Sequence, residues 1–348
     1  MPPPTLPLSR ADVNRAGKIL ATLGSALSET RKANAILEEW RLRHSLPLQT
    51  LRDIITGHLQ ALQPDAIVVH RLKREPSIVA KLRIQEGMDL ARMQDLGGLR
   101  AVICDQARLQ TLAGVFTASG FPHSLARSYD YIARPKPSGY RSLHLVHRYH
   151  NPAVPESHGL LVEIQLRTQI QHAWATALET VDAFRQSSLK SSQDPTDEWQ
   201  DFFRLSGAAL ALLEDCPVNE QYAGRTSEDI FAETVRQMDL LLVPQKLRSY
   251  ANAVRLITGA DDANTCFLLE LDITSGTVNY RSFPPDQLEQ ANKEYLVAEA
   301  RAKESGALVV LAVAESPQKL REAYPNYFME TDRFVALLTE VKRRALTG

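Results

Sequence analysis

Two carboxylates in the first half of this 348-residue chain, Asp95 and Glu163, are candidates for metal ligands and for a general base. Asp95 stands just before the apolar run GLRAVIC, and Glu163 lies within LLVEIQLR; both runs are predicted strands. Carboxylates at neighbouring strand ends can bind Mg²⁺, and one can accept a proton from an attacking hydroxyl. Most single acids are only surface groups or salt-bridge partners. Glu163 is the stronger candidate, because it interrupts an apolar strand and alternates with Gln165 and Arg167.

A basic segment upstream has the composition of a phosphate site. Arg71 and Lys73 end a predicted strand, Ser77 lies near a helix N-terminus, and Lys81 follows one turn later. Free N–H groups at the helix start, with both lysines, can hold phosphates. Arg100 carries a planar guanidinium that can stack on an adenine. The alternative for the basic spacing alone is a solvated charged surface.

The segment KPSGYRSLH, residues 136–144, presents an aromatic side chain on a turn. Tyr140 follows Pro137 and Gly139, and cationic groups border it at Lys136 and Arg141, with His144 nearby. Such a turn can support a stacked base and its phosphates. The alternative is that Tyr140 packs into the core. On the helix after Arg167, His172 and Trp174 are both candidates for core residues, and for Trp174 this is the preferred interpretation.

Hydrophobic periodicity predicts the elements that position these residues. Apolar residues recur at three and four positions through residues 10–62, which indicates a helical lead-in. Strands are predicted at 66–73, 98–104, 142–149 and 160–167, and helices at 76–85, 106–120 and 168–184. The first domain is therefore predicted to be a mixed sheet flanked by helices.

The sequence pattern of the second half of the chain predicts a helical segment followed by a small group of strands and helices. Residues 187–198 are polar and read as a loop, and a mostly helical segment runs from 199 to 257. A hairpin at 266–283, a helix at 285–303, a strand at 307–314 and a helix at 331–344 follow. The predicted class is α+β with three parts: a helical lead-in at 1–62, a domain with trailing helices at 63–257, and a small α+β domain at 263–348.

Composition excludes several classes of protein. The chain is 44% hydrophobic and 23% charged, which is ordinary for a globular protein, and its longest apolar run is too short to span a bilayer. No secretory signal is recognised at the N-terminus, so a cytoplasmic location is expected. The three cysteines lack zinc-finger spacing. The net charge of −1 argues against a broad nucleic-acid footprint, so any RNA partner must be held by a local patch.

Four segments together resemble the synthetase domain of the RelA/SpoT family over about residues 66–180: RLKREPSIVAKL, QDLGGLRAVICD, YDYIARPKPSGYRSLHL and VEIQLRTQIQHAW. The family transfers the pyrophosphate of ATP to a ribose 3′-hydroxyl on a nucleotidyltransferase-like mixed β-sheet flanked by helices. Its D-I-A-G-I-R motif reads D-L-G-G-L-R here, which keeps both functional ends. No hydrolase domain is expected before this region.

The resemblance implies a role for each site residue. Asp95 and Glu163 would hold Mg²⁺, and Glu163 would be the base for the 3′-hydroxyl. The side chains that would contact ATP are Arg71, Lys73, Ser77, Lys81 and Arg100, with the two arginines on either side of the adenine. Those that would contact the acceptor are Lys136, Tyr140, Arg141, His144, Gln165, Arg167 and His172, with Tyr140 stacked on its base.

The C-terminal part contains Tyr324-Pro325-Asn326-Tyr327, which resembles the Y-x-x-Y element of CapRel-like fused toxin–antitoxin proteins. In those proteins a zinc-less, pseudo-zinc-finger-like domain blocks the nucleotide site until a phage protein binds. Tyr324 and Tyr327 are accordingly predicted to be regulatory, and the alternative is simple core packing. The leading hypothesis is a pyrophosphokinase that acts on the 3′-terminal adenosine of the tRNA CCA end, inhibits translation and is released by a phage capsid-type protein.

Two alternatives stay open. The acceptor can instead be GDP or GTP, because Tyr140 can stack on guanine as readily as on adenine, and the chain would then be a small alarmone synthetase. The site can also have been kept only as a nucleotide-sensing or interaction module without catalysis.

Overall fold

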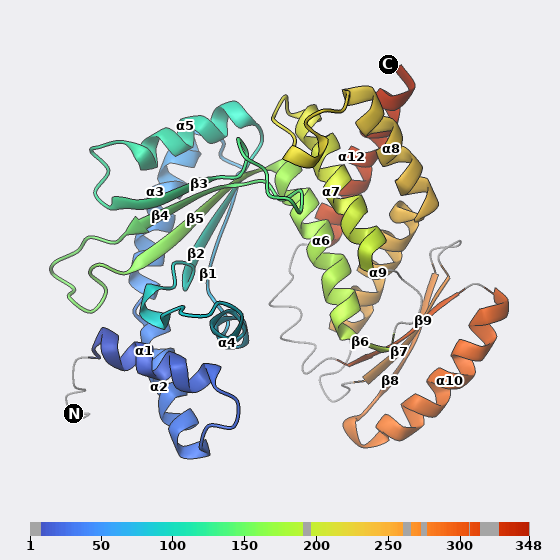
Figure 1. The fold of residues 1–348 in the computed structure, drawn as a ribbon, viewed down its shortest axis with the longest axis horizontal. Helices are drawn as coiled ribbons and strands as arrows, with labels where there is room; N and C mark the ends of the chain where they lie inside the picture. Colours follow the sequence, from blue (N-terminus) through green and yellow to red (C-terminus); the bar gives the residue numbers. More distant parts are fainter. Residues whose placement is uncertain are drawn as a thin grey trace. The chain divides into compact units, whose positions relative to one another are not determined.

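The computed structural model describes residues 8–190, 196–259, 266–272, 277–305, 307–313 and 327–347. The chain divides into two compact units (Figure 1). The first comprises Met1–Tyr131 and Ser142–Gln169, and the second comprises Ile132–Arg141 and Ile170–Gly348. Among the described helices, none combines the length and the apolar character that a membrane crossing requires.

A five-stranded mixed sheet forms the centre of the first unit, as predicted. Its strands are β1 (Ile67–Leu72), β2 (Gly97–Ile103), β3 (Ser124–Asp130), β4 (Leu143–Arg148) and β5 (Leu161–Thr168). Their order in the sheet is β1-β2-β5-β4-β3. β2 and β5 are parallel and the other neighbours are antiparallel. The central position of β5 places Glu163 in the middle of the sheet.

Helices α3 (Ser45–Leu62) and α5 (Gln106–Thr117) cover the apolar face of this sheet, with α3 against β1 and β2 and α5 against β2 and β5. Leu99 and Ala101 on β2 and Ile164 on β5 are buried on this face, as expected for alternating strand residues. The Asp105 side chain accepts a hydrogen bond from the backbone N–H of Arg108 and so caps the start of α5.

Helices form a second core of the first unit. It joins α1 (Arg10–Ala21), α2 (Leu27–Leu42), α4 (Glu75–Ile84) and the short 3₁₀ helix η1 (Leu90–Arg92). Buried Val13, Leu37 and Ile78 belong to this core. Of the predicted lead-in helices, α1 packs directly against α4, the helix that carries Ser77 and Lys81, and α2 packs against α1.

Five helices form the larger part of the second unit: α6 (Gln169–Ser187), α7 (Thr196–Leu213), α8 (Ser227–Leu240), α9 (Val243–Gly259) and α12 (Tyr327–Thr347). α12 packs against α7, α8 and α9. Phe334 of α12 stacks on Phe203 of α7 with ring centroids 5.9 Å apart. The last described helix is therefore part of the helical core.

An antiparallel sheet completes the second unit, with strand order β6 (Ser188–Lys190), β9 (Leu308–Val313), β7 (Cys266–Asp272) and β8 (Thr277–Phe283). The 3₁₀ turn η3 (Pro285–Gln287) leads into α10 (Leu288–Ser305). Phe267 and Leu269 of β7 join the core of the helices, whereas Leu268 packs with Tyr295 of α10. The sheet is consequently covered on both faces, as Figure 1 shows for α10 and α9.

The structure differs from the sequence prediction in two places. β3 was not predicted, and residues 187–198, predicted as a loop, include β6 and the start of α7. The division into domains at 1–62, 63–257 and 263–348 stays a prediction.

Candidate active site

The register of the first unit's sheet gathers polar side chains on the face opposite α3 and α5. Residues paired directly across neighbouring strands point to the same face. Arg100 of β2 pairs with Gln165 of β5, Gln165 pairs with His144 of β4, and His144 pairs with Tyr129 of β3. Gly98 pairs with both Arg71 and Glu163. This polar face carries Arg71, Arg100, Arg127, Tyr129, His144, Glu163, Gln165 and Arg167.

Glu163 is at the centre of a hydrogen-bonded chain on the polar face. Its Oε1 lies 2.9 Å from Nδ1 of His144, and its Oε2 accepts a hydrogen bond of 2.8 Å from Nε2 of Gln165. Arg167 in turn donates to Oε1 of Gln165 at 3.2 Å. The structure thus confirms that residues 163, 165 and 167 share one strand face, and it adds His144 to this group.

The surroundings of Glu163 keep it ionised. Burial alone would raise the pKa of its carboxyl, and the charge of Asp95 acts in the same direction. The hydrogen bonds and charge from His144 and the hydrogen bond from Gln165 outweigh both, so the pKa lies below its usual value. A carboxylate only accepts hydrogen bonds, so Nδ1 of His144 carries the proton that it donates to Glu163.

Asp95 is held by the two predicted phosphate-binding lysines. Nζ of Lys73 lies 2.9 Å from Oδ2, and Nζ of Lys81 lies 2.9 Å from Oδ1. Burial would raise the pKa of Asp95, but these two hydrogen bonds and charges lower it on balance. The charge of Asp95 also acts to raise the pKa of Glu163, so the two carboxylates are near enough to interact, and their shared role as metal ligands stays a prediction.

The backbone around Lys73 is fixed by the neighbouring elements. The N–H of Lys73 donates to the carbonyl of Leu96 at 2.8 Å, and its own carbonyl accepts from Nε of Arg41 at 2.9 Å. Ser77 lies exposed in the first turn of α4, where the helix has free N–H groups. Arg71 is exposed and Arg100 is half-buried, and the two residues lie on adjacent antiparallel strands.

The predicted base-stacking turn belongs to the second unit and is tightly packed there. Nζ of Lys136 lies 5.1 Å from the centre of the Tyr140 ring, and that ring meets Trp174 of α6 edge-on at 6.5 Å. Trp174 is buried, as predicted, and its indole N–H donates to the carbonyl of Phe203 on α7. Tyr140 is half-buried, so it combines packing with an accessible surface.

Arg141 has a partner that the sequence did not reveal. It lies 2.6 Å from Glu214, at the end of α7, and both side chains are buried, 3% and 6% exposed. A buried pair of this kind holds its two elements firmly, because removal of one partner leaves an uncompensated charge. The ion pair with Glu214 thus gives Arg141 a positioning contact within the second unit, and its contact with the acceptor stays a prediction. His172 is buried as well.

Two glycines allow the turn to approach α7 closely. Gly139 has φ of +88°, and a Cβ at Gly207 would lie 2.8 Å from the carbonyl oxygen of Gly139. The place of Tyr140 in the second unit therefore depends on α7, which lies outside the four motifs.

The oxygen donors of Asp95 and Glu163 fit a hard divalent cation such as Mg²⁺. Each of their four carboxylate oxygens accepts one hydrogen bond and keeps lone-pair capacity for a second contact. No group of three or more His, Cys, Asp or Glu side chains with the spacing of a metal site occurs among the described residues. Tyr324 lies outside the described residues, and of Tyr327 only the backbone, at the start of α12, is described.

The mixed sheet flanked by helices, with a polar face on the side opposite α3 and α5, defines an α+β fold. Residues 70–184 match the family model described as a region found in RelA/SpoT proteins. This match confirms, for that region, the resemblance to the RelA/SpoT family that the motifs predicted. The CapRel-like resemblance of the C-terminal part stays a prediction.

Similar curated proteins include the GTP pyrophosphokinase YjbM of Bacillus subtilis, 36% identical over 116 residues, which are 32% of this chain and 54% of that protein. A GTP pyrophosphokinase of Streptomyces antibioticus is 32% identical over 248 residues, 67% of this chain and 27% of that protein. The chain thus spans about half the length of the first relative. The crystal structure of small alarmone synthetase 1 from Bacillus subtilis bound to its product pppGpp is 26% identical, with a TM-score of 0.44, over 51% of this chain and 93% of that one.

Proposed function

We propose that this protein is an ATP-dependent pyrophosphokinase, which transfers the pyrophosphate group of ATP to a ribose 3′-hydroxyl. The observation that carries the proposal is the network of His144, Glu163 and Gln165, electrostatically linked to Asp95 and its two lysines. This arrangement puts an ionised carboxylate beside a group of cations on one sheet face. A base and a triphosphate can meet there.

In the proposed reaction Glu163 accepts the proton of the 3′-hydroxyl, and the oxygen attacks the β-phosphorus of ATP in line. The bond between the β-phosphorus and the oxygen that bridges it to the α-phosphorus breaks, and AMP leaves. His144 and Gln165 keep the Glu163 carboxylate oriented, while Lys73, Lys81 and the start of α4 hold the phosphates. Positioning and electrostatics supply most of the rate enhancement in such transfers.

Asp95 and Glu163 are the residues that would hold Mg²⁺, consistent with their oxygen donors. When bound, the ion would offset the negative charge of the phosphates. Lys73 and Lys81 would then exchange their contacts with Asp95 for contacts with the phosphates of ATP.

Two acceptors are open to this chemistry. The CapRel-like resemblance favours the 3′-terminal adenosine of tRNA as the acceptor, and the pyrophosphorylated tRNA would then block translation. A guanosine nucleotide is supported by the names of the relatives, which are GTP pyrophosphokinases. The near-neutral net charge of the chain favours the small acceptor, because a large RNA footprint needs an excess of basic residues.

Purified protein incubated with γ-labelled ATP and either GDP or tRNA tests the proposal. Label on GDP or on the RNA is expected for the wild type, and its distribution identifies the acceptor. In Glu163→Gln the amide oxygen can still accept the hydrogen bond from His144, but the side chain cannot take up a proton. Transfer should therefore fall by about 10²–10⁴-fold. Label transfer by Glu163→Gln at the wild-type rate, or none by the wild type with either acceptor, would favour the nucleotide-sensing module.

The regulatory part of the proposal concerns the C-terminal residues. We propose that they restrain the enzyme and that a phage capsid-type protein releases it, as in the CapRel-like proteins. Replacement of Tyr324 and Tyr327 by alanine is then expected to change toxicity in growing cells. Equal growth with intact and altered proteins, at equal soluble levels, would remove the regulatory role.

A further inference from the structure

A residue outside the four motifs holds part of the backbone of the proposed phosphate site. Arg41 lies in the last turn of α2, and its Nε donates a hydrogen bond of 2.9 Å to the carbonyl of Lys73, 32 residues further along the chain. The family model matches residues 70–184, so Arg41 lies outside the region that this comparison covers. The proposed roles of the motif residues do not account for this contact.

Lys73 stands between two elements, after the end of β1 and before the start of α4. Backbone polar groups of such a connecting residue need partners elsewhere in the chain. The N–H of Lys73 donates to the carbonyl of Leu96, and its carbonyl accepts from Arg41, so both groups have one. The Lys73 side chain starts from this fixed backbone and brings its Nζ to 2.9 Å from Oδ2 of Asp95.

The donor in this contact is a charged group that is not paired with an acid. Among the residues that the structure describes, no acidic side chain lies within salt-bridge distance of Arg41. Its side chain is half-buried, which shields the bond from water. Because a charged donor makes a stronger hydrogen bond than a neutral one, Arg41 is suited to fix the Lys73 carbonyl.

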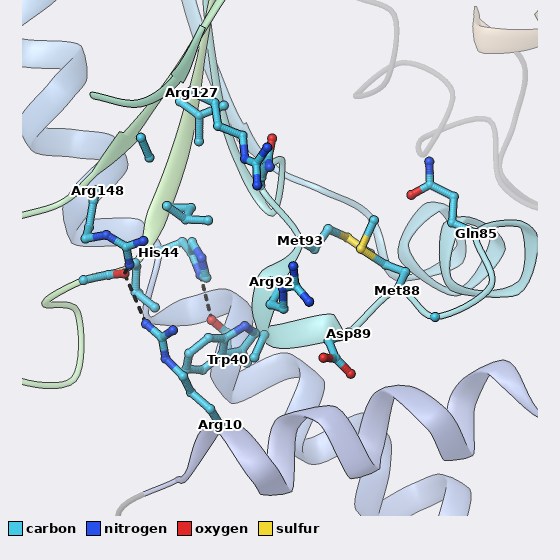
Figure 2. Close-up of a pocket in the computed structure, with 18 of the residues that line it drawn as sticks. Arg10, Trp40, His44, Gln85, Met88, Asp89, Arg92, Met93, Arg127 and Arg148 are labelled. Atoms are coloured by element: carbon cyan, nitrogen blue, oxygen red, sulfur yellow. Dashed lines mark hydrogen bonds between the residues drawn. The ribbon is translucent and has the colours of Figure 1, made fainter. Parts of the chain in front are cut away.

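The junction of α2 and α3, residues 40–48, also contacts the start of β2. A Cβ at Gly97 would lie 3.3 Å from Cβ of His44 and 3.2 Å from Cγ of Leu48, so the junction packs directly on this strand. His44 is held in turn, because its Nδ1 donates to the carbonyl of Trp40 at 2.9 Å (Figure 2). The junction therefore contacts both backbone segments of the proposed phosphate site.

We infer that Arg41 is a positioning residue for ATP binding. It holds the Lys73 backbone in the place from which the Lys73 side chain can exchange Asp95 for the phosphates of ATP. The inference rests on the proposed function, because it assumes that Lys73 contacts ATP. The lead-in helices thus contribute to the nucleotide site through a hydrogen bond to its backbone, without a contact between Arg41 and the nucleotide.

Calorimetric titration with α,β-methylene-ATP and Mg²⁺ tests the inference without catalysis, because this analogue lacks the bond that the proposed reaction breaks. Arg41→Met removes the donor and is expected to raise the Kd of the analogue about tenfold. Arg41→Lys keeps a charged donor and is expected to restore part of the affinity. Arg43→Met is the matched control, since Arg43 ends the same helix and donates to the carbonyl of Leu8 and to Glu39 instead.

A double-mutant cycle distinguishes positioning from a general structural role. Lys73→Met removes the side chain that Arg41 positions, so the addition of Arg41→Met to this variant should change the Kd by less than about twofold. Additive losses in the double variant would show that Arg41 acts independently of Lys73, which contradicts the inference. An unchanged Kd in folded Arg41→Met, or an equal loss in the Arg43→Met control, would contradict it as well.

The outcomes separate the inference from the proposed function. Label transfer by the wild type, together with equal Kd values for the wild type and Arg41→Met, would keep the function and overturn the inference. The expected Kd values without label transfer by the wild type would keep the positioning role, within a nucleotide-sensing module, and remove the enzyme. A wild type that does not bind the analogue would overturn both.

Discussion

At the scale of single residues, the proposed base is an acid whose pKa is lowered rather than raised. A low pKa makes Glu163 a weak base, so its contribution must come from its position against the hydroxyl rather than from its proton affinity. Because its pKa is lowered, the Glu163 carboxylate stays ionised even when the pH falls toward the usual pKa of a glutamate. Any loss of activity in mildly acidic solution is therefore expected to have another cause than protonation of Glu163.

His44 is a residue at which acid is expected to reduce stability. It is 1% exposed, and its Nδ1 lies 2.9 Å from the carbonyl of Trp40. Its pKa falls from 6.5 to about 4 in the folded chain because burial disfavours the charged imidazolium. Between these values the unfolded chain binds the extra proton, so stability rises with pH in this window and is lost as the pH falls through it.

We predict that His44→Gln makes the chain less sensitive to acid. The change from pH 7 to pH 5 should cost the wild type about 2 kcal/mol through this histidine alone, and the variant should be spared that part. Urea unfolding of both proteins at the two pH values measures the difference. An equal loss of stability in the two proteins would show that His44 is not neutral in the folded state.

At the scale of elements, strands β1, β2, β4 and β5 were predictable because their apolar residues are continuous or alternate. The exposed edge strand β3, SLARSYD, was not, since it lacks an apolar pattern and is fixed by pairing with β4. The same reason explains why the partner of Arg141 was not detected. Glu214 looks like an ordinary charged residue, and only the contact between distant segments brings it to Arg141.

The contact between the Tyr140 turn and α7 gives a prediction at this scale. Gly207→Ala would place a methyl group 2.8 Å from the Gly139 carbonyl and force the turn away from α7. Because alanine favours a helix over glycine, α7 itself should not suffer. The KM for the acceptor is expected to rise about tenfold through misplacement of Tyr140, with the KM for ATP unchanged.

Gly224→Ala is the control for this experiment, because a Cβ at Gly224 would meet no atom within 4 Å. Steady-state kinetics with varied acceptor and varied ATP separate the two KM values. If Gly207→Ala raised both KM values equally, or neither, the turn would have no specific role in acceptor binding.

At the scale of the whole molecule, the second unit has a core that joins distant parts of the chain. Phe203 of α7, Phe267 of β7 and Phe334 of α12 belong to one buried cluster. A truncation near residue 264 would therefore remove core residues as well as any regulatory surface. Loss of activity after such a truncation would report on folding, so point substitutions are the better test of autoinhibition.

We predict that Phe334→Ala destabilises the second unit by about 3–5 kcal/mol, because it leaves a cavity beside Phe203. Leu346→Ala on the same helix is the matched control, since Leu346 is 80% exposed and its removal should change stability by less than about 0.5 kcal/mol. Thermal and chemical unfolding of both variants measure the difference. Similar stability of the two would mean that α12 is not part of this core in solution.

The packing of α12 also bears on when the second unit can fold during synthesis. Domains generally fold as units while the chain leaves the ribosome from its N-terminal end, at about 5–20 residues per second. The turn with Tyr140 emerges well before Phe334, Val335 and Leu338, which complete the core of its unit. In nascent chains that stop before residue 327, the core residues that pack against α12 would stay exposed. Chaperones or proteases would bind such chains before a nucleotide could.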